Sequence, residues 1–205
     1  GGGYKGQAAQ HSQSIEAVFA HFPGLLVVSP STPADAKGLL KTAIRNDNPV
    51  VFIEHKMIYN EKGEVPNEEH FVPFGKAAER REGKDVTLLG YSYAMGFVNA
   101  AADRLASEGI EAEVIDLRSI NPLDMETIAS SIRKTHRCVI VHEAHTTCGF
   151  GAEITARIQE QLFDELDAPV LRVGGIDVPV PYAVGLESAM LPSVDRICTA
   201  VRSIR

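Results

Sequence analysis

The sequence lacks the features that mark membrane, secreted and nucleic-acid-binding proteins. Its 205 residues include only three cysteines, Cys138, Cys148 and Cys198. An odd and widely spaced set argues against a disulfide framework and for a reducing compartment. No apolar run approaches the roughly 20 residues that cross a bilayer. Because no run of lysine or arginine is present and the formal net charge is −7, we expect neither nucleic acid nor an anionic membrane as a partner.

Several catalytic signatures are missing as well. There is no Gly-x-Ser-x-Gly elbow of a serine hydrolase, and no Gly-x-x-x-x-Gly-Lys-Ser/Thr loop that would cradle a phosphate. The first residues, Gly1-Gly2-Gly3-Tyr4, are neither an initiator methionine nor a signal peptide. We therefore expect the chain to begin inside a longer protein.

The first 60 residues predict an incomplete α/β domain. Apolar periodicity and helix-stop signals predict helices over 14–22 and 32–45 and strands over 25–29 and 49–54. So few elements bury too small a fraction of their surface to close a core. Residues 1–60 are therefore expected to be the carboxy-terminal part of a larger domain. Residues 61–75 are polar and contain two prolines, which predicts a linker.

Residues 76–205 alternate strands and helices with regular lengths. The pattern predicts strands over 86–91, 111–117, 138–142 and 170–173, and helices over 94–107, 122–134, 152–166 and 192–204. This alternation is typical of a mostly parallel sheet covered by helices on both faces. Four strands and four helices are enough for a complete domain.

Two groups in the second part resemble ligand sites only loosely. Gly149-Phe150-Gly151 follows a strand and precedes a helix, but Ile154 stands where a dinucleotide fingerprint needs its third glycine. A helix-entry loop is therefore favoured over a nucleotide site. A second group has spacing that fits no zinc pattern, so we predict no metal there; its members are His136, His142, His145 and Cys148.

Glu143 and His11 are the two polar positions that could carry chemistry. Glu143 follows a buried strand, at the carboxyl end where open α/β sheets place their sites; a local cap or ion pair is the favoured interpretation. His11 precedes a predicted helix, whose positive end would favour neutral imidazole. Neutral imidazole can accept or donate a proton near neutral pH. On the residues alone, a histidine that hydrogen-bonds a nearby turn is favoured over a catalytic one.

The segment 43–49 ends a predicted helix and leaves free carbonyl groups. Clustered carbonyls with an asparagine side chain could hold a monovalent or divalent cation. On spacing alone, a plain helix stop is the favoured interpretation.

Long runs of the sequence resemble one enzyme family. They are QHSQSIEAVFAHFPGLLVV, STPADAKGLL, DNPVVFIEHK, AEVIDLRSINPLDMETI, GFGAEITARI, LDAPVLRVGGIDVPVPYA and LPSVDRI. Together they resemble the beta subunit of the thiamine-diphosphate-dependent decarboxylating component of 2-oxo acid dehydrogenase complexes, over essentially the whole chain. The resemblance implies an α/β fold in which 1–60 is the carboxy-terminal part of a pyrimidine-binding domain, 61–75 a linker and 76–205 a transketolase carboxy-terminal-like domain.

The same resemblance implies roles for particular residues. His11, in the QHSQ run, matches a histidine that lines the channel to the thiazolium ring and assists acyl transfer to the lipoyl group. A structural potassium site built mainly from backbone carbonyls matches Ala43, Ile44, Asn46 and Asn48, although Asn46 stands where many members have an acid. Thiamine diphosphate and Mg²⁺ are implied as cofactors held mainly by an alpha subunit and an upstream beta segment. No residue here matches the glutamate that protonates the aminopyrimidine ring.

The implied partners are an alpha subunit, in a heterotetramer of two alpha and two beta chains, the lipoyl acyltransferase component and a small-molecule substrate. The implied location is the bacterial cytoplasm or the mitochondrial matrix. The expected activity is dehydrogenation of a 2-oxo acid, most of all pyruvate, or of acetoin, and only with the alpha subunit present. His142-Glu143-Ala144 with Gly149-Phe150-Gly151 favours acetoin or branched-chain substrates, whereas 177–182 favours pyruvate, so the substrate stays open.

Two alternatives belong to other classes. Residues 75–205 could act chiefly as an assembly module that docks the small basic peripheral domain of the acyltransferase, which the acidic balance of the chain suits. The chain could also belong to another transketolase-type enzyme, such as a deoxyxylulose phosphate synthase. The run around His11 argues against that last choice.

Overall fold

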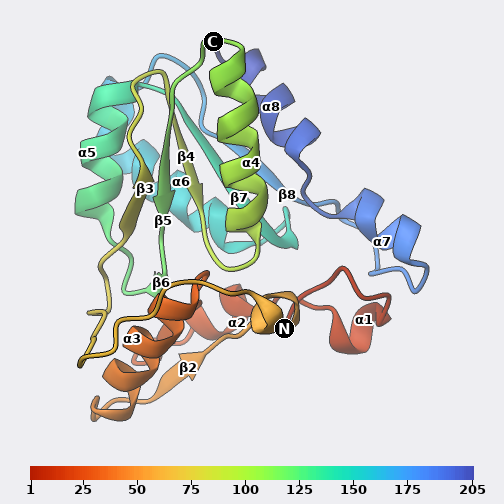
Figure 1. Cartoon of the computed structure of the whole chain (residues 1–205). Helices are drawn as coiled ribbons and strands as arrows, with labels where there is room; N and C mark the ends of the chain where they lie inside the picture. The colour runs from red at the N-terminus through yellow and green to blue at the C-terminus, as the bar shows by residue number, and fades with distance from the viewer.

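Two sheets organise the chain in the computed structural model, which describes residues 1–205. The larger sheet has the strand order β3-β5-β4-β7-β8 and the smaller one β2-β1-β6. The strands are β1 Leu26–Val28, β2 Val50–Phe52, β3 Ala78–Arg81, β4 Val86–Gly90, β5 Ala112–Asp116, β6 Ser119–Asn121, β7 Cys138–His145 and β8 Leu171–Gly175. The α-helices are α1 Ala8–His11, α2 Glu16–Ala20, α3 Pro33–Ile44, α4 Ala94–Ser107, α5 Met125–Thr135, α6 Phe150–Leu162, α7 Val184–Met190 and α8 Val194–Ser203, with 3-10 turns η1 Lys56–Asn60 and η2 Phe163–Glu165. The larger sheet stands above the smaller one in Figure 1.

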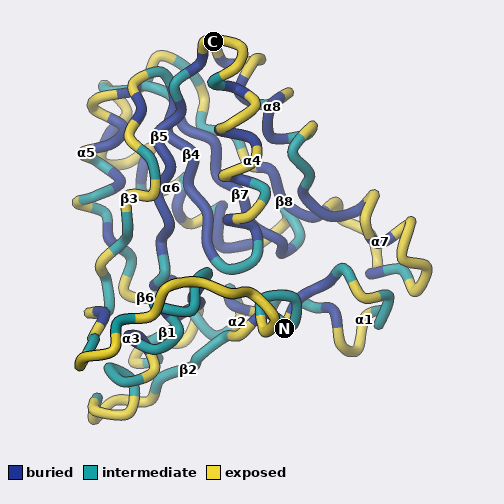
Figure 2. The backbone as a smooth tube through the Cα atoms, in the orientation of Figure 1, coloured by how far each residue is buried: buried dark blue, intermediate teal, exposed yellow.

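The larger sheet is parallel except at one edge. Strands β5, β4, β7 and β8 run parallel, and β3 pairs antiparallel with β5. Successive strand residues face opposite sides: Leu88 packs in a core with α4 and α8, and Leu89 in a second core with α5 and α6. Strands β4, β5 and β7 are buried along almost their whole length and are dark blue in Figure 2. The predicted mostly parallel sheet covered on both faces is therefore confirmed.

The smaller sheet joins strands from both halves of the sequence. β1 pairs parallel with β2 and antiparallel with β6, where Val27 faces Asn121. The segment predicted as a linker has no regular structure, yet it packs against α3. Val72 is buried with Leu39, and Thr42 Oγ1 donates to the Val72 carbonyl at 2.9 Å. The core of the first 60 residues is thus closed partly by residues that follow it.

Helix α3 begins where the sequence predicts. The Thr32 side chain accepts a hydrogen bond from the Asp35 amide at 3.1 Å, and Pro33 occupies the first turn. This arrangement satisfies an amide that the helix cannot pair internally. The helix thereby brings Asp35 toward the larger sheet.

Two buried carboxylates and two partly exposed arginines tie α3 to that sheet. We call this group the ion cluster; it consists of Asp35, Arg80, Asp116 and Arg118. Arg80 pairs with both Asp35 and, at 2.8 Å, Asp116. Arg118 pairs with Asp35 at 3.0 Å. The Asp116 side chain is 0% exposed, and burial raises its pKa. Buried carboxylates need paired partners, so the bonds from the two arginines join α3 to the larger sheet.

Five elements were not predicted from sequence: α1, η1, β3, β6 and α7. Strand β3 reads Ala-Glu-Arg-Arg and is largely solvated at the sheet edge, so it has no apolar alternation to detect. Strand β6 has three residues, too few to show a period. The helix predicted over 14–22 is shorter, since only Glu16–Ala20 is helical. No helix of the chain combines the length and the hydropathy that crossing a membrane requires.

Candidate active site

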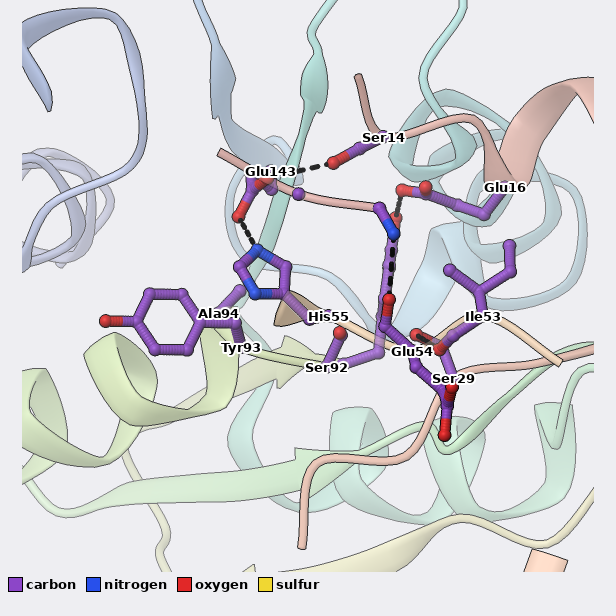
Figure 3. A pocket seen from close by; sticks show the side chains of 13 residues that line it. Ser14, Glu16, Ser29, Ile53, Glu54, His55, Ser92, Tyr93, Ala94 and Glu143 are labelled. Carbon is purple, nitrogen blue, oxygen red and sulfur yellow. Dashed lines mark hydrogen bonds and ion pairs between the residues drawn. The ribbon is translucent and has the colours of Figure 1, made fainter. Parts of the chain in front are cut away.

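His55 and Glu143 meet where the two parts of the chain face each other (Figure 3). His55 follows β2 and caps η1, and Glu143 lies in the carboxyl-terminal half of β7. His55 Nε2 lies 2.7 Å from Glu143 Oε2. The two residues are only 4% and 9% exposed. The carboxyl ends of parallel strands are where sheets of this class place their sites, and this pair lies at such ends.

The hydrogen bonds of His55 assign its tautomer. Nδ1 accepts from the Met57 backbone amide at 3.1 Å, so this nitrogen carries no proton. The proton of the neutral ring is then on Nε2 and is donated to Glu143. The Tyr93 ring stacks on the imidazole, with centroids 4.7 Å apart and planes 14° apart. His55 therefore has one fixed orientation.

Glu143 binds three donors from distant parts of the chain. Besides His55, it accepts from the Gly3 amide at 2.6 Å and from the Ser14 hydroxyl at 3.0 Å. The Gly3 partner is 140 residues away in sequence, so the local cap expected for Glu143 is wrong. The carboxylate instead joins the first residues of the chain to the larger sheet.

The space beside this pair is small. Glu16 and Tyr91 lie on its wall, and Tyr91 donates to Glu16 at 2.6 Å. Burial raises the pKa of the Glu16 carboxyl, against the opposing effect of the Tyr91 hydrogen bond. The interior offers about 20 Å³ to the centre of a water molecule, which is room for about one water. The His55–Glu143 pair therefore lies against a cavity too small for a substrate.

A second buried carboxylate lies close to the first. Glu187 on α7 is 0% exposed, and its Oε2 accepts from the Gly6 amide at 2.7 Å. Its Oε1 has no hydrogen-bond partner in the protein. A Cβ atom on Gly3 would lie 3.3 Å from Glu187 Oε1 and 3.6 Å from Glu143 Oε1. Gly3 thus lies between the two carboxylates.

His11 is exposed and is the last residue of α1. Its backbone carbonyl accepts from Lys56 Nζ. The next helix begins only at Glu16, and His11 is the last residue of its own short helix. The expected placement of His11 directly before a helix amino terminus is therefore wrong. His11 belongs to the same segment as Gly3 and Gly6, which the two buried carboxylates hold.

The residues expected to hold potassium form a turn after α3. The Asn46 amide donates to the Ala43 carbonyl at 3.2 Å. Asn48 donates to Asn46 Oδ1 from its backbone at 2.9 Å and from its side chain at 3.0 Å. Ile44, the last helical residue, is 72% exposed. Because the turn uses the Asn46 side-chain oxygen, backbone carbonyls are the atoms left for a cation.

The three histidines on or just before β7 form hydrogen bonds with backbone carbonyls. His136 donates to the Glu165 carbonyl and His145 to that of Val178. His142 is fully buried, donates from Nδ1 to the Ala144 carbonyl at 3.0 Å and has no partner on Nε2. Burial lowers the pKa of His142 to about 4. Three or more side chains of His, Cys, Asp or Glu are nowhere arranged to hold a metal ion.

Gly149 and Gly151 fit closely around His142. Gly149 precedes α6 as its cap, as the helix-entry interpretation predicts. A Cβ atom on Gly151 would lie 2.5 Å from His142 Nε2. These glycines therefore leave room for a buried ring, which explains them without a nucleotide.

Sequence reasoning missed His55, Tyr93 and Glu187. A usable signal existed for His55, because it directly follows a predicted strand, as Glu143 does. Tyr93 gives no signal without the fold. Glu187 lies on α7, a short helix whose other residues are largely exposed, and the apolar pattern did not reveal it.

The comparisons with known proteins agree with this architecture. Residues 1–62 match the family described as "Transketolase, pyrimidine binding domain", and residues 75–197 match "Transketolase, C-terminal domain". Among solved structures, a "Split gene transketolase, inactive beta4 tetramer" matches with a TM-score of 0.79 at 24% identity, over 96% of this chain and 62% of that one. At that identity the likeness shows the fold alone, and it confirms the predicted transketolase-like α/β fold.

Curated relatives carry the name pyruvate dehydrogenase E1 component subunit beta. The protein of Porphyra purpurea is 49% identical over 96% of this chain and 59% of its own length. That of Rhizobium meliloti is 48% identical over 96% of this chain and 43% of its own. The mitochondrial protein of Drosophila melanogaster is 50% identical over 99% and 57%. The resemblance inferred from the sequence runs is thus confirmed, and the chain spans about half the length of these relatives.

Proposed function

The chain belongs to the transketolase C-terminal domain family, which matches more than half of its residues, and we propose that it serves in the beta subunit of a 2-oxo acid dehydrogenase of the pyruvate type. The observation that carries this proposal is identity of 48–50% over 96–99% of the chain with pyruvate dehydrogenase E1 beta subunits. Acetoin and branched-chain 2-oxo acids are the other substrates to be tested. The cytoplasm or the mitochondrial matrix is the proposed location.

His11 is the catalytic residue proposed for this chain. It is exposed, on a segment that buried groups hold. An imidazole is the side chain best suited to carry a proton near neutral pH. In the proposed role, His11 gives a proton to the lipoyl sulfur that is released as the lipoyl disulfide opens during acyl transfer.

The small cavity between the two parts of the chain does not fit thiamine diphosphate. The cavity beside His55 has room for about one water, and its buried carboxylates would repel a diphosphate. No metal-binding group is present for Mg²⁺. We propose that an alpha subunit and an upstream beta segment hold both, so that this chain acts only in a heterotetramer of two alpha and two beta chains. The cofactor would supply the carbanion chemistry.

Potassium is proposed at the turn after α3, through backbone carbonyls of Ala43, Ile44, Asn46 and Asn48. The clustering of free carbonyls at that helix end supports the proposal. Its role would be structural, so the melting temperature in potassium chloride should exceed that in equimolar sodium chloride. Equal melting temperatures in the two salts would remove the site from consideration.

The test of the proposed function uses the complete subunit with a pyruvate dehydrogenase alpha subunit. With thiamine diphosphate and Mg²⁺ added, oxidation of pyruvate, acetoin and 3-methyl-2-oxobutanoate is followed with an artificial electron acceptor, and acylation of a lipoyl domain is measured separately. We expect pyruvate to be the best substrate and His11→Ala to slow acylation more than oxidation. Absence of both a complex and any oxidation would refute the proposal.

Assembly and docking form the second candidate function. Exposed apolar side chains gather on one stretch of the second part: Ile176, Val178, Tyr182, Val184 and Leu186. Apolar patches of this kind mark protein contacts, and the net charge of −7 suits a basic acyltransferase domain. A pull-down at low salt tests this role, and no retention of the acyltransferase would count against it.

A further inference from the structure

The segment of residues 1–14, which we call the His11 loop, is held by two buried carboxylates of the second part. Glu143 accepts from the Gly3 amide and the Ser14 hydroxyl, near the two ends of the loop. Glu187 accepts from the Gly6 amide. Both carboxylates are at least nine-tenths buried. Hydrogen bonds to a charged acceptor are about twice as strong as neutral ones, so these contacts add to the packing of Tyr4, whose hydroxyl donates to the Pro192 carbonyl at 3.0 Å.

Lys56 also holds the loop. Its ammonium donates to Gln7 Oε1 at 2.7 Å and to the His11 carbonyl. Lys56 directly follows His55, whose Nε2–H is donated to Glu143. Lys56, the first residue of η1, and the two carboxylates therefore hold the loop, and His11 is exposed.

We infer that Glu143 and Glu187 are positioning residues that set the place of the His11 imidazole; the inference rests on the proposed role of His11. Neither carboxylate touches the His11 ring. Each acts through backbone amides of the loop, and a displacement of about 1 Å at a reacting group is enough to slow a reaction about a hundredfold. The two glutamates belong to the second part of the chain, which thereby takes part in catalysis by the first.

The two carboxylates differ in how many of their oxygens accept hydrogen bonds. Glu143 faces a donor on each side, the His55 ring on one oxygen and Gly3 with Ser14 on the other. A glutamine there would point its N–H groups at a donor in either orientation. Glu187 uses one oxygen and has no partner on the other, so a glutamine fits without conflict. Glu143→Gln should therefore disturb the anchoring of the loop, whereas Glu187→Gln should be tolerated.

The first measurement is amide hydrogen exchange in the full chain, which needs no activity. In Glu143→Gln the Gly3 amide, and in Glu187→Ala the Gly6 amide, should exchange at least about tenfold faster, because each loses a charge-assisted bond. Glu187→Gln, which keeps an acceptor but loses its charge, should give a rate at Gly6 between those of the parent and Glu187→Ala. The matched control is Glu126→Gln, which removes a carboxylate that is 86% exposed. Parent exchange rates in both harmful variants would overturn the inference.

The second measurement is a double-mutant cycle in the assembled enzyme. Ser14→Ala removes one bond to Glu143 without leaving a cavity, and Glu187→Ala removes the other anchor. Each should lower kcat of lipoyl acylation with little change in KM for the lipoyl domain, and each should have no further effect when His11→Ala is present. Equal losses with and without His11 would overturn the inference, because a general structural defect acts in both backgrounds.

The two experiments separate the inference from the proposed function. A parent enzyme that cannot acylate a lipoyl domain refutes the proposed function, while the exchange rates still report whether the carboxylates anchor the loop. A parent that acylates normally but shows no dependence of the Glu187→Ala effect on His11 refutes the inference alone. Ser14→Ala and Glu187→Gln keep both tests decisive if Glu187→Ala does not fold.

Discussion

His142 should make the protein sensitive to acid in a way that one substitution removes. The ring is fully buried, its Nδ1–H is donated to the Ala144 carbonyl, and its Nε2 has no partner. A charged imidazole here would have no solvent and no counter-charge, which is why burial lowers the pKa from 6.5 to about 4. In the unfolded chain the ring is hydrated and has the ordinary imidazole pKa of 6.5.

The sign and size of the effect follow from linkage. Below pH 6.5 the unfolded state binds a proton that the folded state refuses until about pH 4. Unfolding is therefore favoured progressively as the pH falls through this window, and His142 contributes no such penalty above it. A difference of this size corresponds to roughly 3 kcal/mol of unfolding free energy lost between pH 7 and 4.

The perturbation is His142→Asn, whose side-chain amide keeps a donor near the position of Nδ1 but cannot titrate. Denaturant unfolding followed by circular dichroism at several pH values between 4 and 7 gives the unfolding free energy of parent and variant. The variant should be the less stable one at pH 7, because it leaves part of the ring volume empty. Its disadvantage should shrink, and then reverse, toward pH 4.

A matched control is His21→Asn, which removes an exposed imidazole at the end of α2. Comparison with this variant distinguishes the effect on unfolding free energy of removing any histidine from the effect of removing a buried one. If the difference between parent and His142→Asn stayed constant from pH 7 to 4, the ring would not be held neutral in the folded state, and the reasoning would be refuted.

Three further predictions concern other parts of the fold. Arg80→Met leaves the ion cluster with excess negative charge and should lower the free energy of unfolding, measured with denaturant, by about 3–5 kcal/mol. Arg81→Met breaks an exposed pair and should lower it by under about 1 kcal/mol. Similar losses in the two variants would contradict the importance of the ion cluster. Gly151→Ala forces a methyl to 2.5 Å from the His142 ring and should lower the unfolding free energy by about 1–3 kcal/mol, whereas Gly96→Ala, with open space at its Cβ, should raise it by about 0.5–1 kcal/mol. Under native conditions Cys148 alone should react with a thiol reagent, because the other two thiols are buried; more than one reactive thiol per folded chain would refute the packing of the core.

The second part of the fold could be predicted from sequence because its elements are long and carry clear periods. Helix α4 has the bounds 94–107 that the pattern predicts, and the buried strands β4, β5 and β7 were each found within a few residues. Strands β3 and β6 could not be predicted. Pairing with β5 and β1 creates them, and no local pattern carries that information.

The candidate site could be predicted only in pieces. Sequence placed Glu143 at a strand end and singled out His11 through a family resemblance. It could not show that Glu143 meets His55, 88 residues earlier, because strand order decides which strand ends face each other. It also misjudged the setting of His11, since the pattern gave no helix before residue 14, whereas His11 ends the short helix α1.

Strand β6 has a consequence for anyone who cuts or recombines this chain. It supplies the antiparallel neighbour of β1 from residues 119–121, far beyond the point where the family match to the pyrimidine-binding domain stops, at residue 62. A fragment that ends there would expose the bare edge of β1, and an unpaired edge invites pairing between molecules. A chimera that exchanges the second part for that of a relative must therefore keep a strand that pairs with β1 as β6 does. Without that pairing, the first part would expose an edge that promotes aggregation even if each half is folded.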